Sequence, residues 1–121
     1  MMAEELRVEV VEERGRLAVA AVAGELDIAT AGDLHTRVSA ALATHRDLIL
    51  DLADVGFCDS SGFNALLRIR RRVGETGGRL ALAAPPVQVE RLLALSGGGR
   101  DLFAVHPSRA EALAAYDAGD L

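Results

Sequence analysis

The sequence predicts an α/β fold in which a mixed five-stranded sheet is covered by about four helices. Residues 6–10 alternate apolar and charged side chains, and the apolar run 17–23 follows a polar turn at 12–16 that contains Gly15. These two segments predict an antiparallel hairpin. From residue 30 onward, helix-like patterns alternate with short apolar runs. That alternation is typical of parallel strands joined by right-handed helical crossovers.

The composition indicates a single globular domain over residues 1–121. Apolar residues make up 50% of the chain and charged residues 26%, which is ordinary for a soluble protein. No apolar run is long enough to cross a bilayer, and the first residues do not form a signal-peptide pattern. We therefore expect no membrane insertion and a cytoplasmic location.

Charge and residue usage argue against several classes of function. The net charge is −5, there is no lysine, and aromatic residues make up 3% of the chain, so direct nucleic-acid contact is not expected. Cys58 is the only cysteine, which excludes an internal disulfide and fits a reducing compartment. The three histidines lie in separate segments without ligand-like spacing, so we expect neither a metal site nor a cofactor.

The second predicted strand ends in a turn at residues 24–27. Thr30 then caps the first helix, and Asp33 gives a weaker version of a capping box. The next strand, at 48–52, is apolar on both faces apart from one aspartate, which predicts a position inside the sheet.

The second helix is predicted to start near Phe63, to bury one apolar stripe and to end at Gly77-Gly78. A fourth strand follows at 79–84 and a third helix at 87–95, with the glycine run at 97–99 as its stop.

The last predicted elements are a short strand at 102–105 and a final helix. Ser108 and Glu111 form the capping box of this helix. The apolar residues assigned to it are Ala110, Leu113 and Ala114.

The segment of greatest interest is the Asp-Ser-Ser-Gly turn at residues 59–62, between the central strand and the second helix. Such a turn exposes hydroxyl groups beside unpaired backbone N–H groups, a place that favours anionic groups. Two interpretations are open on spacing alone. Either Asp59, Ser60 and Ser61 simply compete to be the N-cap, or the turn has a function.

An enzymatic role for Ser60 is not supported by its surroundings. A serine hydrolase needs a Gly-x-Ser-x-Gly elbow and a histidine base, whereas Asp59 precedes Ser60 and no histidine is placed as its base. A neighbouring carboxylate does not activate a hydroxyl as an imidazole does. The glycine run at 97–99 lacks the phosphate-binding loop pattern, so nucleotide binding has no positive support.

The second helix carries arginines at positions 68 and 70–72. A solvated helix face is a commoner explanation for such a run than a surface for an acidic partner. Arg70 lies close to the apolar stripe, and we expect its guanidinium to reach toward the Ser60 turn. Cys58 is interpreted as a small buried hydrophobic residue.

Three segments occur in a characteristic order along the chain. They are Gly24-Glu25-Leu26-Asp27 with Thr30-Ala31 and Leu34, then Asp59-Ser60-Ser61-Gly62 after a Leu-Asp-Leu strand, and then Leu95-Ser96-Gly97. In these segments the chain resembles the bacterial anti-sigma-factor antagonists of the STAS-domain family. The resemblance covers roughly residues 6–115 and implies a STAS-type single domain. The Asp-Ser-Ser-Gly segment is fairly specific for the phosphorylatable members, and the Gly-Glu-Leu-Asp segment only for the wider family.

This resemblance implies partner switching without catalysis by the chain itself. The unphosphorylated antagonist binds an anti-sigma factor that is also a serine kinase, and so frees a sigma factor. The kinase uses ATP to phosphorylate the first serine of the pair, which is Ser60 here, and the phosphorylated form is released. A separate metal-dependent serine phosphatase restores the first form.

The residues expected to contact the partner lie in two turns that we predict to share one edge of the fold. They are Glu25, Asp27, Thr30, Asp59, Ser60, Ser61, Gly62 and Asn64. Asn64 stands where many relatives carry a small residue, and Phe63 replaces a common leucine. We expect backbone N–H groups to hold the hydroxyl of Ser61 as a cap, which leaves Ser60 as the freer acceptor.

A second role remains open, because related STAS domains serve as scaffold or docking subunits of transporters or stress-signalling assemblies. Some of these never cycle through phosphorylation, and the Ser60 region would then be a docking contact only. Whether a kinase-like anti-sigma factor or a transporter is encoded beside the gene distinguishes the two roles.

Overall fold

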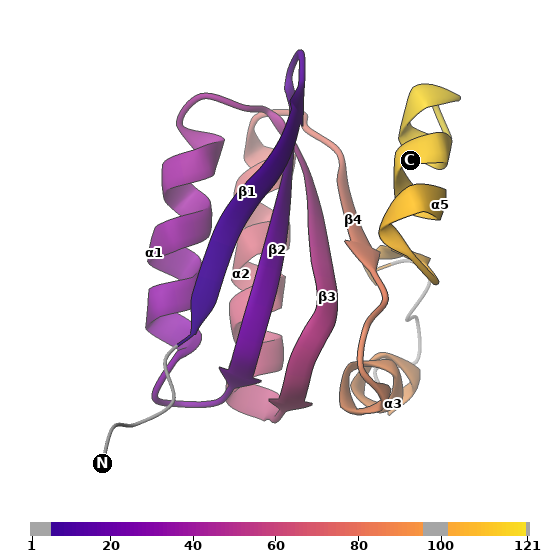
Figure 1. Cartoon of the computed structure of the whole chain (residues 1–121). Helices are drawn as coiled ribbons and strands as arrows, with labels where there is room; N and C mark the ends of the chain where they lie inside the picture. Colours follow the sequence, from indigo (N-terminus) through magenta and orange to yellow (C-terminus); the bar gives the residue numbers. More distant parts are fainter. Residues whose placement is uncertain (1–5, 96–101, 121) are drawn as a thin grey trace.

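The computed structural model describes residues 6–95 and 102–120 and places helices on both faces of a sheet (Figure 1). The five strands lie in sequential order across the sheet. They are β1 (Arg7–Arg14), β2 (Leu17–Leu26), β3 (Asp47–Cys58), β4 (Leu80–Ala83) and β5 (Ala104–His106). β1 is antiparallel to β2, and each later pair is parallel. The predicted mixed five-stranded sheet and its opening hairpin are confirmed.

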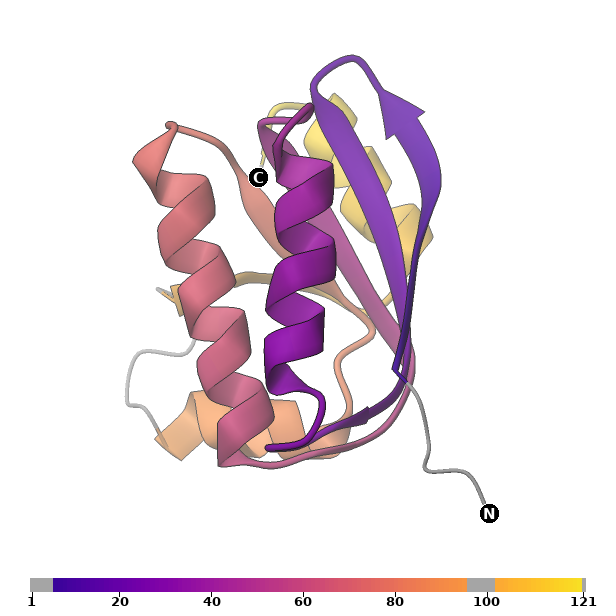
Figure 2. The ribbon, with the colours of Figure 1, turned by 90° about the vertical axis from the view of Figure 1, so that its left-hand side faces the viewer.

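Four helices belong to the described part of the chain. They are α1 (Ala31–Leu42), α2 (Ser60–Glu75), α3 (Val87–Leu95) and α5 (Arg109–Asp117). Figures 1 and 2 show α1 and α2 side by side along one face of the sheet, whereas α5 lies on the other face. α3 crosses the end of the molecule at which β2 and β3 finish (Figure 1). None of the helices in residues 6–95 and 102–120 has the length and apolarity needed to span a membrane.

The core has two parts, one on each face of the sheet. The larger part lies under α1, α2 and α3, and the smaller part lies under α5. Leu48 and Leu50 point into the larger part and Ile49 into the smaller one, so β3 is buried on both faces. The predicted central position of this strand is therefore confirmed.

Three of the strands are longer than predicted. β1 continues to Arg14, so only Gly15 and Arg16 form the turn, with Gly15 at a φ of 56°. An edge strand tolerates charged side chains, which is why residues 12–14 pair with β2 despite their polarity. β2 runs to Leu26, beyond the turn predicted at 24–27, because its partner β3 also extends to Cys58.

The apolar stripe predicted for α5 is correct only at Leu113, and the predicted N-cap at Ser108 is confirmed. The side chain of Ser108 accepts a hydrogen bond from the backbone N–H of Glu111 at 3.1 Å. Leu113 is buried as predicted, but Ala110 and Ala114 are exposed and Ala112 is buried in their place. Alanine carries a weak hydrophobic signal, so a helix this rich in alanine does not fix its own orientation.

Buried carboxylates of β3 orient α5. The Nε of Arg109 lies 2.8 Å from Asp51, and the hydroxyl of Tyr116 donates to Asp47 at 2.5 Å. Burial and the hydrogen bond to Asp47 both raise the pKa of Tyr116, so this hydroxyl stays protonated. Asp47 and Asp51 are four residues apart in a strand and so face the same side of the sheet. These two contacts determine which face of α5 packs on the sheet, which the alanines alone do not.

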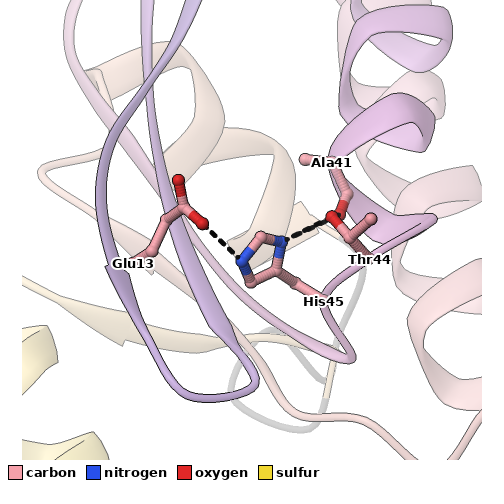
Figure 3. Close-up of polar contacts among 4 residues, drawn as sticks. All are labelled: Glu13, Ala41, Thr44 and His45. Atoms are coloured by element: carbon pink, nitrogen blue, oxygen red, sulfur yellow. Dashed lines mark hydrogen bonds and ion pairs between the residues drawn. The ribbon is translucent and has the colours of Figure 1, made fainter.

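His45 joins the hairpin to the end of α1 (Figure 3). It precedes the start of β3, whereas Ser60 follows the end of that strand. Its Nε2 lies 3.0 Å from Glu13 Oε1, and its Nδ1 lies 3.2 Å from the carbonyl oxygen of Ala41. The hydroxyl of Thr44 also lies 3.0 Å from Nδ1, so both ring nitrogens have hydrogen-bond partners. The histidine therefore acts as a structural link within this end of the fold.

Candidate functional site

The C-terminal ends of β2 and β3 bring the two predicted turns together, at the bottom of Figure 1. Leu26 and Cys58 are neighbours in the parallel register, and the backbone N–H of Asp59 donates to the carbonyl of Leu26 at 3.1 Å. The loop at 27–30 and the turn at 59–62 therefore lie at one edge of the fold. We call these residues, 25–30 and 57–64, the Ser60 edge.

Asp59 is the N-cap of α2, and the helix begins at Ser60, three residues before the predicted start at Phe63. The Oδ1 of Asp59 accepts from the backbone N–H groups of Ser61 at 2.9 Å and Gly62 at 3.1 Å. A carboxylate in this position also interacts favourably with the helix dipole. The prediction that Ser61 supplies the cap is therefore wrong, because the stronger acceptor occupies that position.

Exposure distinguishes the two serines instead. Ser60 is exposed and Ser61 is half-buried. Asp59 satisfies the N–H groups of the first turn, so the Ser60 hydroxyl is not needed for capping. Asn64 is also exposed and lies one turn after Ser60, on the same face of α2. The hydroxyl of Ser60 is thus presented to solvent on an ordered helical turn.

The loop before α1 is organised by Asp27 and Thr30. The Oδ1 of Asp27 accepts from the backbone N–H groups of Ala29 at 3.0 Å and Thr30 at 3.2 Å. The hydroxyl of Thr30 donates to the carbonyl of Glu25 at 2.6 Å and accepts from the N–H of Asp27 at 3.1 Å. These bonds fix the shape of the loop, and the bond from the N–H of Asp59 to the carbonyl of Leu26 places it beside the turn at 59–62.

The predicted capping box of α1 is not formed. Thr30 occupies the N-cap position, but its side chain makes no cap hydrogen bond because it bonds to residues 25 and 27. Asp33 forms an ion pair with Arg37 at 3.0 Å. A short polar side chain often prefers a local turn to a helix cap, and here the turn prevails.

Gly62 is buried and packs against the end of β2. A Cβ atom at this position would lie 2.5 Å from the carbonyl oxygen of Leu26 and 2.6 Å from its Cβ. Only glycine permits this approach. Gly62 therefore joins α2 to the loop of β2, whereas the exposed Ser60, Asn64 and Glu25 remain available for contact.

Cys58 is 2% exposed, as predicted for a small buried residue. Burial, followed by the charge of Asp59, raises the pKa of the thiol from 9.0 to about 11. The folded state thus favours the neutral thiol, and this contribution to stability, present below pH 9.0, is lost as the pH rises to about 11.

We expect iodoacetamide to alkylate native Cys58 at pH 8 at least about 100-fold more slowly than the same chain in guanidinium chloride, because only the exposed thiolate reacts. Mass spectrometry of timed samples measures both rates. Alkylation of the native protein at the rate of the unfolded chain would contradict the burial of this residue.

Arg70 does not reach the Ser60 edge. Its Nε donates to the carbonyl of Leu102, and its side chain lines an open cavity of about 310 Å³ with Val73 and Leu80. It lies ten residues after Ser60, or roughly 15 Å along a helix with a rise of 1.5 Å per residue. The expectation that its guanidinium approaches Ser60 is therefore wrong.

Two exposed apolar residues at the Ser60 edge were not predicted. Ile28 is 83% exposed and Phe57 is 41% exposed. An isoleucine inside a polar turn was the signal in the sequence that could have identified Ile28.

The glycine run at 97–99 and most of the Leu95-Ser96-Gly97 segment lie outside the described residues. The described part of the chain holds no group of three or more His, Cys, Asp or Glu side chains able to bind a metal ion.

The family model of the STAS domain matches residues 9–112. The chain belongs to the STAS domain family. This STAS domain is 31% identical over 104 residues to an anti-sigma F factor antagonist of Paenibacillus polymyxa, a match that covers 84% of this chain and 85% of that protein.

Solved STAS structures share the fold. An anti-sigma factor antagonist from Mycobacterium paratuberculosis superposes with a TM-score of 0.77 at 28% identity, covering 92% of this chain and 93% of that one. The Bacillus protein SpoIIAA in its phosphorylated form superposes with a TM-score of 0.70 at 24% identity, covering 89% of this chain and 96% of that one. The STAS domain described here therefore has the fold expected from its sequence.

Proposed function

We propose that the chain is an anti-sigma-factor antagonist that works by partner switching. In its unphosphorylated form it binds an anti-sigma factor with serine-kinase activity, and phosphorylation of Ser60 releases it. The observation that carries the proposal is the exposed hydroxyl of Ser60 on the first turn of α2, beside the capping carboxylate of Asp59. The similarity to two anti-sigma factor antagonists supports it.

The position of Ser60 suits a residue that is modified by another protein. A kinase can approach an exposed hydroxyl, and the nearby helix N-terminus partly stabilises the phosphate that it adds. The Ser60 edge offers no histidine that could act as a base toward the hydroxyl, because residues 25–30 and 57–64 contain none. On this proposal the chain is a cytoplasmic kinase substrate and binding module, not an enzyme, and a separate serine phosphatase removes the phosphate.

Incubation with ATP and a serine-kinase anti-sigma factor of the same organism tests this function. We expect one phosphate per chain, located on Ser60 by phosphopeptide mass spectrometry. Ser60→Ala should bind the kinase but take up no phosphate, and Ser61→Ala should be phosphorylated normally. Phosphate on Ser61 of the wild type would contradict the assignment. Tight binding without any phosphate would favour a scaffold role.

A further inference from the structure

The loop between β2 and α1 holds a large apolar side chain in solvent. Ile28 is 83% exposed, whereas Val87 is 52% exposed and Phe57 is 41% exposed. Leu95 is 82% exposed, but the next residues lie outside the described range, so its surroundings are incomplete. A single exposed apolar residue is common on protein surfaces. The position of Ile28 has to be considered together with its neighbours.

The backbone around Ile28 is firmly held on both sides. Asp27 accepts hydrogen bonds from the N–H groups of Ala29 and Thr30, and the hydroxyl of Thr30 bonds back to Glu25. The carbonyl of Asp27 also accepts from the N–H of Ala31 at 2.9 Å. These bonds therefore fix the backbone of the loop that carries Ile28. An ordered loop loses little conformational entropy when a partner binds it.

A second apolar side chain lies on the neighbouring strand. Phe57 pairs in register with Glu25, so these two residues are adjacent across β2 and β3. Ile28 follows Glu25 by three residues, and Ser60 follows Phe57 by three. The two apolar side chains thus belong to the two segments that form the Ser60 edge. Aromatic and aliphatic groups are typical of the centre of a protein interface.

The carboxylates at this edge are not neutralised within the chain. Glu25 is exposed and Asp27 is half-buried, and neither forms an ion pair with any described residue. At the other end of the hairpin, Glu12 forms an ion pair with Arg14, and Glu13 lies 3.0 Å from the ring of His45. Unpaired carboxylates beside apolar groups complement a partner that carries basic groups around an apolar pocket.

We propose that Ile28 is the apolar anchor of the Ser60 edge. It inserts into an apolar pocket of the partner protein, Phe57 packs beside it, and arginine or lysine groups at the rim of that pocket face Glu25 and Asp27. The inference rests on the proposed function, because the partner is the kinase that modifies Ser60. A few such anchors carry most of the binding energy of an interface. Ile28 would therefore decide much of the affinity without touching the phosphorylated hydroxyl.

The test compares Ile28→Ser with Ile28→Leu and with a matched control, Val10→Ser. Val10 is 40% exposed and pairs with Ala20 of β2. Ala20 precedes Leu26 by six residues, so Val10 lies roughly 20 Å from the Ser60 edge at about 3.3 Å per residue. Calorimetry with the serine-kinase anti-sigma factor used in the phosphorylation experiment gives each Kd. We expect Ile28→Ser to weaken binding about ten- to a hundredfold, since it removes one buried aliphatic side chain from the interface.

Ile28→Leu keeps the apolar volume and is expected to bind within about fivefold of the wild type, and Val10→Ser is expected to bind as the wild type does. Higher ionic strength should weaken wild-type binding, because the basic rim faces exposed carboxylates. Equal Kd values for Ile28→Ser and the wild type, with equal melting temperatures, would overturn the inference and leave the proposed function intact. If the wild type neither binds the kinase nor receives phosphate, the proposed function fails first, and the inference fails with it.

Discussion

Replacement of Gly62 with alanine is expected to destabilise the fold by about 3 kcal/mol, at the upper end of the usual cost of overpacking. The new Cβ would meet the carbonyl oxygen of Leu26 at 2.5 Å. That oxygen accepts the hydrogen bond from the N–H of Asp59, so it cannot move away without breaking the link between β2 and α2. Urea unfolding followed by circular dichroism measures the loss.

The same substitution in the same helix supplies the control. A Cβ at Gly74 would have no atom within 4 Å, and Gly74 lies inside α2. Alanine is the better helix former, so Gly74→Ala is expected to raise the free energy of unfolding by about 0.5–1 kcal/mol. If Gly62→Ala is as stable as the wild type, the close approach of α2 to β2 is wrong. A lower free energy of unfolding for Gly62→Ala and a higher one for Gly74→Ala would support this close approach.

Phosphorylation of Ser60 is expected to lower the affinity for the kinase more than about 100-fold, which corresponds to a loss of roughly 3 kcal/mol of interface energy. The phosphate adds about −1.5 to −2 charges at neutral pH. It would lie beside the carboxylate of Asp59, the N-cap of α2. Like charges gathered in an interface cost energy, so no refolding of the chain is needed for release.

Surface plasmon resonance with the immobilised kinase measures this change for the phosphorylated and unmodified chains. Ser60→Asp should also weaken binding, although less, because a carboxylate carries one charge. Asn64→Asp is the matched control, since it adds one charge on the same face of α2 at a distance of one turn, and its effect should be smaller. Equal affinity of the phosphorylated and unmodified chains would rule out a phosphate-controlled switch.

The order of elements could be predicted from the sequence because each strand and helix carries its own periodic pattern. The central strand is an example, since the run at 48–52 is apolar on both faces and is buried on both. The ends of the strands were harder to predict from the sequence. β2 and β3 extend each other through pairing from Gly24 to Leu26, and no local pattern encodes a partner that lies thirty residues away.

The candidate site was predictable in location and less so in its internal bonding. The two turns were placed at one edge because both follow strand ends. Which of Asp59, Ser60 and Ser61 caps the helix depends on the backbone conformation. Asp59 has an extended backbone, and its carboxylate accepts hydrogen bonds from the first turn of α2. Thr30 likewise has several hydrogen-bond acceptors within reach, and only the folded loop selects between them.

The sequential order of the strands has a consequence for how the protein is made on the ribosome. Each strand pairs with the one synthesised just before it, so the growing chain can extend its sheet one strand at a time from the N-terminus. The Ser60 edge is built by β2, α1, β3 and α2, all of which end by Glu75. The Ser60 edge can therefore assemble while β4, β5 and α5 are still being translated.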